Sequence, residues 1–153
     1  MDLRDDLSFI DLLAGSYFRL VGHSLIPDGL LGAEAAKWLY EAAPFSILAH
    51  NTAPDPVFIY SNKAAQQLFE YKWDEFVTLP SRLSAEAPDR TERQRFLEQV
   101  ASHGFITGYR GIRISKSGKR FHIENTTVWQ LIDAEGKCHG QAAMLPHTLD
   151  LEP

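Results

Sequence analysis

FITGYRGIRISKSGKRFHIENTTVWQLIDAEGKCHGQAAML, residues 105–145, is the stretch that decides the fold. It contains three runs that predict strands, 105–115, 119–132 and 137–145, and the first two are rich in β-branched and aromatic residues. They are separated by Lys116-Ser-Gly118 and Ala134-Glu-Gly136, and short interruptions that contain glycine are typical of β-hairpin turns. The stretch therefore predicts three consecutive antiparallel strands.

The middle of the chain predicts a strand pair followed by short helices. Residues 45–50 and 57–60 are apolar runs on either side of a proline-containing turn. Ser61-Asn62 offers a cap for a helix over 63–69, and Trp73-Asp-Glu-Phe76 predicts one further turn.

A longer helix is predicted between this region and the final strands. Asp89-x-x-Glu92 has the spacing of a capping box, Phe96 and Val100 lie on one face, and Gly104 is a natural end. The other charged residues of this helix, which include Arg93, predict a solvated face carrying ion pairs.

Two helices are predicted at the N-terminus. Residues 3–21 carry an apolar stripe at helical spacing, and the alanine-rich segment 33–43 ends before Pro44. The complete order of elements predicts the α+β class, with one antiparallel sheet and helices packed on its faces.

Composition sets limits on the function. The 153 residues carry a net charge of −5, and the basic residues between 110 and 120 straddle a turn, so we interpret them as solubilising rather than as a nucleic-acid site. A single cysteine, Cys138, excludes an internal disulfide framework. The acidic N-terminus and the lack of a long apolar run predict a cytoplasmic protein without membrane contact.

Several motifs resemble known families. Residues 58–65, 69–71 and 73–76 resemble the second strand and first helices of a PAS domain, and the turns at 115–118 and 133–136 resemble its last two hairpins. Similarity to bacterial proteins of the MEKHLA family, a PAS-like family, is carried by Trp38-Leu-Tyr40, Pro44-Phe-Ser-Ile-Leu-Ala-His50, Leu79-Pro-Ser-Arg-Leu-Ser84 and Tyr109-Arg-Gly111.

The resemblance covers nearly the whole chain and implies a PAS-like five-stranded antiparallel sheet, with short helices over one face and a small enclosed cavity. It implies an N-terminal helical extension over 1–43, a PAS-like (MEKHLA) domain over 44–147 and a tail over 148–153. The family is also found as the C-terminal domain of some plant homeodomain-leucine zipper transcription factors. Its presumed role there is sensing or regulatory protein contact.

The cofactor is unknown from the sequence. Light-sensing PAS domains carry a reactive cysteine in an Asn-Cys-Arg-Phe-Leu-Gln helix, and Ser81 stands where that cysteine would fall, so adduct chemistry with flavin is not expected. Arg113 and Ile123 stand at the positions of flavin-binding asparagines. Flavin binding without an adduct stays open. The six histidines form no haem or metal motif.

A polar cluster is predicted inside the sheet. Alternation along 121–132 places Asn125 and Thr127 on the buried face with Ile123 and Trp129. In a PAS register Tyr109, Arg113 and Gln141 point the same way. The predicted ligand site is completed by Tyr60, Ser81, Leu83 and Phe96. These polar groups satisfy one another or hold a ligand, and the lack of an acid for Arg113 in these strands favours the ligand.

We therefore predict a stand-alone sensory or regulatory domain that binds a small carboxylate- or carbonyl-bearing ligand. No kinase, cyclase or DNA-binding segment follows Leu145, so we expect it to signal through a separate protein partner. The alternative is a protein-interaction or dimerisation module without a physiological ligand, with a homodimer formed through the N-terminal helix. No catalytic motif is present, and an enzyme of unknown type is kept only as a further alternative.

Overall fold

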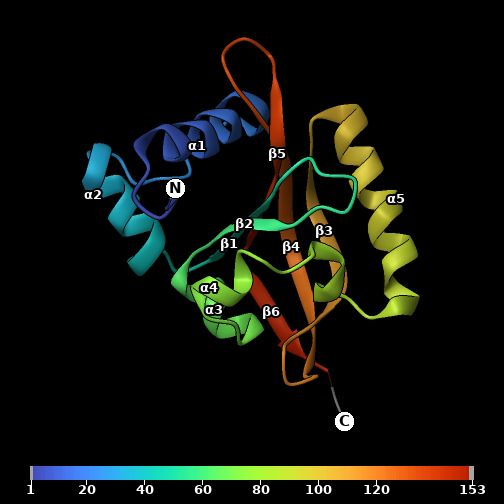
Figure 1. Cartoon of the computed structure of the whole chain (residues 1–153). Coiled ribbons are helices and arrows are strands. Elements are labelled where there is room, and N and C mark those ends of the chain that lie inside the picture. Colours follow the sequence, from blue (N-terminus) through green and yellow to red (C-terminus); the bar gives the residue numbers. More distant parts are fainter. Residues whose placement is uncertain (1, 152–153) are drawn as a thin grey trace.

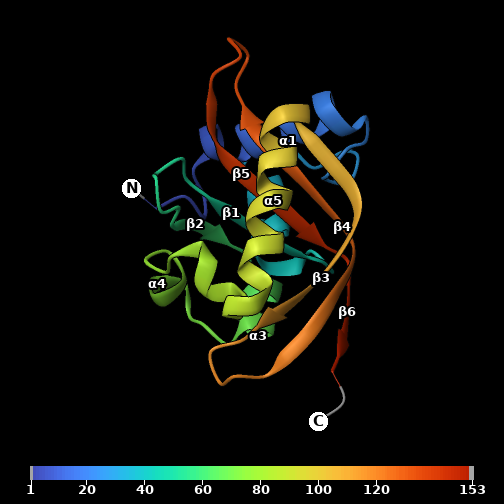
Figure 2. The ribbon, with the colours of Figure 1, turned by 90° about the vertical axis from the view of Figure 1, so that its right-hand side faces the viewer.

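The computed structural model describes residues 2–151, without the side chains of 87–89, and places helices on both faces of one antiparallel sheet (Figures 1 and 2). In chain order, with a π-helical turn η1 and a 3-10 turn η2, its elements are α1 (Leu7–Val21), α2 (Gly32–Lys37), η1 (Trp38–Ala42), β1 (Ser46–His50), β2 (Phe58–Ser61), α3 (Lys63–Phe69), α4 (Trp73–Phe76), η2 (Ser81–Ser84), α5 (Ala87–His103), β3 (Phe105–Ile114), β4 (Arg120–Ile132), β5 (Cys138–Leu145) and β6 (His147–Asp150).

The strands of the main sheet lie in the order β2-β1-β5-β4-β3. The five predicted strands are confirmed, and the sheet gains a sixth, β6, which pairs with β4. β5 and β6 follow one another along the same edge of β4, because Thr127 pairs with Met144 and Glu124 with His147. Pro146 separates them, since it has no N–H to donate to the ladder. The predicted tail 148–153 therefore begins inside a strand.

Asn62 joins three elements at the start of α3. Its Oδ1 accepts from the N–H of Ala65, at 3.1 Å, which makes it the predicted helix cap, and from the N–H of Ile47, at 3.0 Å. Its amide nitrogen donates to the carbonyls of Leu39 and Phe45, at 3.1 and 2.9 Å. All the hydrogen-bonding groups of this fully buried side chain are used, so Asn62 has a structural role.

The N-terminal helices close the outer face of the sheet. α1 packs on β4, where the indole of Trp129 donates to the carbonyl of Leu13 and meets the ring of Tyr17 edge-on, with ring centroids 4.8 Å apart. α1 therefore packs on the sheet of its own chain. None of the helices between residues 2 and 151 is both long and apolar enough to cross a membrane.

The inner face of the sheet is covered by α3, α4 and α5, and Figure 2 shows α5 crossing in front of the strands. α5 ends before Gly104, as predicted, but begins at Ala87 after the N-cap residue Glu86. The predicted capping box at Asp89 is therefore wrong, because that residue lies within the first turn; its side chain lies outside the described residues.

Two bulges change which side chains of β4 face inward. Gly108 on β3 and Asn125 on β4 both have positive φ, and the register slips by one residue beside each of them. A single extra residue in a strand moves every later side chain to the other face. Beyond Asn125, the inner face of β4 is therefore built by Thr126 and Val128 instead of Thr127 and Trp129.

Candidate functional site

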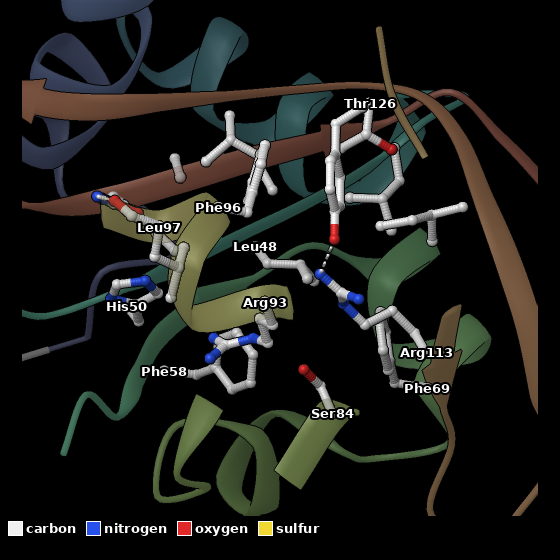
Figure 3. A pocket seen from close by; sticks show the side chains of 18 residues that line it. Leu48, His50, Phe58, Phe69, Ser84, Arg93, Phe96, Leu97, Arg113 and Thr126 are labelled. Atoms are coloured by element: carbon white, nitrogen blue, oxygen red, sulfur yellow. Dashed lines mark hydrogen bonds between the residues drawn. The ribbon is translucent and has the colours of Figure 1, made fainter. Parts of the chain in front are cut away.

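A cavity of about 50 Å³ lies between α5 and the inner face of the sheet (Figure 3). That volume is room for roughly three or four water molecules. Its walls are mostly apolar, and they are formed by Leu48, Phe58, Phe69, Phe96, Leu97, Ile123, Val128, Leu145 and the alanines 49, 142 and 143. An apolar cavity into which a few polar groups converge is typical of small-molecule sites.

Arg113 enters the cavity from β3 and is buried. One terminal nitrogen donates to the carbonyl of Ile112 at 2.8 Å, and the other lies 3.5 Å from the hydroxyl of Tyr109. The guanidinium carbon lies 5.6 Å from the centroid of the Tyr109 ring, which in turn stacks on Phe96 with centroids 3.7 Å apart. Arg113, Tyr109, Gln141 and Phe96 all line the cavity, as predicted.

Arg93 enters the same cavity from α5, and Figure 3 shows both guanidinium groups turned toward it. One nitrogen of Arg93 donates to the hydroxyl of Ser81 at 2.8 Å. Burial, followed by the positive charge of Arg113, lowers the pKa of Arg93 from 12.5 to about 10. The guanidinium therefore keeps its charge at neutral pH.

The predicted solvated face of α5 is wrong at Arg93, which is buried. The sequence did hold a signal for this, because Arg93, Phe96 and Val100 are spaced as i, i+3 and i+7 and so share one face of a helix. The charge of Arg93 favoured the solvated interpretation over that spacing.

Three polar atoms around the cavity have no hydrogen-bond partner among the described residues: His50 Nε2, Thr126 Oγ1 and Gln141 Oε1. His50 Nδ1 lies 2.9 Å from the carbonyl of Asn51, which can only accept, so Nδ1 carries the proton and Nε2 of the neutral ring is an acceptor. Burial is the main cause that lowers the pKa of His50, and the charge of Arg93 adds to it. Buried polar atoms of this kind call for water or a ligand.

Two of the predicted inward residues do not reach the cavity. Asn125 is exposed, because the bulge that it forms turns it away from the inner face. Thr127 is buried but does not line the cavity, because the slip places it on the face of Trp129. Thr126 takes the inward position, and strict alternation could not reveal this.

The other predicted residues, Ser81, Leu83 and Tyr60, do not line the cavity, and of their side chains only that of Ser81 is hydrogen-bonded to a residue that does. Ser81 is buried and its hydroxyl accepts a hydrogen bond from Arg93, which lines the cavity. Leu83, on the same 3-10 turn, is partly exposed and does not line the cavity. Tyr60 lies elsewhere, among the rings of Phe9, Tyr40 and Trp73. The prediction that Tyr60 and Leu83 belong to this cavity is wrong.

A flavin does not fit these residues. The cavity is far smaller than the roughly 300 Å³ or more of sites for larger ligands. The Arg113 side chain fills one of the two strand positions that the resemblance compares with flavin-binding asparagines, and apolar Ile123 occupies the other. Among the described residues, no cluster of three or more His, Cys, Asp or Glu side chains has the geometry of a metal site.

Solved structures share the fold of this chain. The PAS domain of a protein from Colwellia psychrerythraea matches 76% of this chain and 92% of its own length, at 19% identity and a TM-score of 0.61. The LOV domain of a blue-light activated histidine kinase from Erythrobacter litoralis matches 72% of this chain and 99% of its own, at 20% identity and a TM-score of 0.57.

An RNA-binding light-oxygen-voltage receptor gives a TM-score of 0.66 at 23% identity over 84% of this chain. The chain spans about a third of that receptor, 35% of its length. At these identities, the likeness shows the PAS-type fold alone.

Sequence comparison identifies the family. No curated protein matches the chain. The family model for the MEKHLA domain matches residues 7–148, which include the N-terminal helix α1 as well as the sheet and the cavity. The chain therefore belongs to the MEKHLA domain family, within a PAS-like fold.

Proposed function

We propose that this chain is a sensory domain that binds a small molecule in the α5 cavity and reports its presence to a protein partner. The observation that carries the proposal is the convergence of two buried arginines and three unpartnered polar atoms on one apolar cavity. Burying such groups costs free energy unless a partner satisfies them. A fold of the sensory PAS type supports the same interpretation.

α5 is the element through which we expect the signal to pass. It supplies Arg93 to the cavity, whereas β3 supplies Arg113, so a ligand held by both side chains would link the helix to the sheet. A ligand shifts a conformational equilibrium only when it binds one arrangement better, and a link across two elements provides that difference. The side of α5 that faces away from the sheet, which includes Gln94, Arg95 and Glu98, is exposed and available to a partner.

Native mass spectrometry of the freshly purified full chain, compared with its denatured mass, tests ligand binding. The protein is then refolded from denaturant, mixed with a deproteinised cell extract and measured again. We expect an added small mass that is lost in Arg113→Ala and kept in Arg110→Ala, a matched exposed arginine on the same strand. A chain that carries no added mass in either measurement would contradict the proposal.

Hydrogen exchange tests the proposed signal. We expect amides of α5 to exchange more slowly in the loaded protein than in the refolded one. Unchanged exchange throughout α5 would mean that ligand binding is not reported through this helix.

The second candidate function, a dimerisation module, is favoured by apolar side chains left exposed in the N-terminal region. Phe18 on α1 is 60% exposed and Leu31 before α2 is 80% exposed. Sedimentation of the chain over a range of concentrations tests it. A dimer that is lost in Phe18→Glu or Leu31→Glu would support this candidate, and a monomer at all concentrations would contradict it.

A further inference from the structure

The two buried arginines of the cavity have no counter-charge among the side chains that the structure describes. Arg93 is 7% exposed and Arg113 8%, and neither takes part in an ion pair among the described residues. Asp55, whose charge acts weakly on Arg93, is bound to the exposed Arg82 instead, at 3.2 Å. Arg82, Arg110 and Arg120, which are exposed, do pair with carboxylates, whereas the buried pair has none among the described side chains.

Within the described part of the chain, most donors of the two guanidinium groups also have no acceptor. Each group has five N–H donors, and the acceptors that they reach are the Ser81 hydroxyl for Arg93, and the Ile112 carbonyl and Tyr109 hydroxyl for Arg113. Two like charges in a cavity with apolar walls repel each other and lose their hydration. Among the described side chains, the two guanidinium groups therefore lack a negative partner, and most of their N–H donors lack an acceptor.

We propose that the cavity is a receptor for a compact oxyanion, a small carboxylate or an inorganic oxyanion, bound between Arg93 and Arg113. This inference rests on the proposed function and names the class of its ligand. An oxyanion supplies both missing properties, because its oxygens accept charge-assisted bonds from a guanidinium fork. The volume of about 50 Å³ suits an anion of roughly three to five non-hydrogen atoms.

Some of the neighbouring groups fit such an anion. The unpartnered acceptors His50 Nε2 and Gln141 Oε1 do not bond an oxyanion and call for water instead. Thr126 Oγ1 has no partner among the described residues and can donate a further bond, and the Tyr109 hydroxyl already lies beside Arg113. The Ser81 hydroxyl accepts from Arg93 at 2.8 Å and thus orients that guanidinium, so Ser81 is a positioning residue. Phe58, Phe69 and Phe96 line the site and lower its local polarity, which strengthens each charged contact.

Thermal unfolding of the refolded full chain tests the proposal. Acetate and nitrate probe planar anions, phosphate probes a tetrahedral one, and sodium chloride at equal ionic strength is the reference. We expect at least one oxyanion to raise the melting temperature saturably beyond chloride. A response to acetate alone identifies a carboxylate site, and a response to nitrate or phosphate alone identifies an inorganic oxyanion site.

The arginine variants locate the site. Arg93→Gln and Arg113→Gln are expected to weaken the response roughly tenfold or more, whereas Arg95→Gln on α5 and Arg110→Gln on β3, both exposed positions, keep it. Arg93→Lys, which keeps the charge but loses the fork, provides a second variant if a glutamine variant fails to fold. It is expected to bind more weakly than the natural chain.

Three results would overturn the inference: no saturable response to any of the three anions, equal loss in the exposed variants, or an Arg93→Lys variant that binds as tightly as the natural chain. Other results distinguish failure of the proposed sensory function from failure of the oxyanion inference. A neutral molecule retained in native mass spectrometry without any anion response keeps the sensory function and rejects the oxyanion, whereas no retained mass and no anion response reject both.

Discussion

The indole nitrogen of Trp129 on β4 donates a hydrogen bond to the main-chain carbonyl of Leu13 on α1, at 3.3 Å. Both side chains are fully buried, and 116 residues of sequence separate them. The contact ties the N-terminal helix to the outer face of the sheet, opposite the face that forms the cavity. α1 is thus part of the folded core, which agrees with a family match that begins at residue 7.

Trp129→Phe is expected to lower the free energy of unfolding by about 1–3 kcal/mol, because it removes this bond and leaves a small void. Urea denaturation measures the change. Trp38→Phe is the matched control, because Trp38 is only half-buried and its loss is expected to cost less. Equal costs at the two positions would show that α1 is not held at Trp129.

Asn125→Val is expected to destabilise the chain by about 1–2 kcal/mol, since Asn125 has a φ of 52° that β-branched residues avoid. Asn125→Gly should be close to neutral, because glycine adopts this φ freely. Thr148→Val, at an exposed position of β6 with ordinary φ, is the control and should change stability by less than about 0.5 kcal/mol. If valine is tolerated at 125, β4 has no bulge there and Asn125 does face inward.

Gly140→Ala is expected to cost about 3 kcal/mol or more, because the strands β5 and β1 approach each other closely at this residue. A Cβ on Gly140 would lie 2.0 Å from the carbonyl oxygen of His50, and main-chain atoms cannot move aside cheaply. Gly136→Ala is the matched control: it also has positive φ, but its Cβ would meet nothing within 4 Å. Chemical denaturation of both variants measures the difference, and comparable losses would contradict the close approach.

His50 is expected to lower the stability of the folded chain as the pH decreases below about 6.5. Its folded-state pKa lies below the ordinary 6.5, chiefly through burial, so below pH 6.5 the unfolded chain binds a proton that the folded chain does not. The contribution is absent above pH 6.5, and it grows on acidification until the folded-state pKa is reached. Its slope is at most about 1.4 kcal/mol per pH unit.

Denaturation between pH 5 and 7 of the natural chain and His50→Gln measures this contribution as the difference in slope. His23→Gln, at an exposed position after α1, should keep the full slope. A His50→Gln variant that loses stability on acidification as steeply as the natural chain would show that His50 is not held neutral.

Local signals predicted most of the fold, because they act within a few residues. The hairpin glycines 118 and 136, the Asn62 cap and the stop at Gly104 each depend on the backbone of their immediate neighbours, and the structure has all four where the sequence indicates. The sequence did not predict β6, because Pro146 is a local signal that ends a strand. β6 forms after it because residues 121–124 of β4, which are distant in sequence, offer a free edge for pairing.

For the site, the sequence by itself determined the alternation of side chains along each strand and the spacing of Phe96 on its helix. Its resemblance to PAS domains then placed Arg113, Tyr109 and Gln141 on the same inner face as Phe96. Only the tertiary structure decided that Arg93 joins them and that Thr126 replaces Asn125 and Thr127. The physical reason is that the burial of a charged helix residue depends on what packs above it, and the face of a strand residue depends on a bulge formed with its neighbour, so both are set by distant segments.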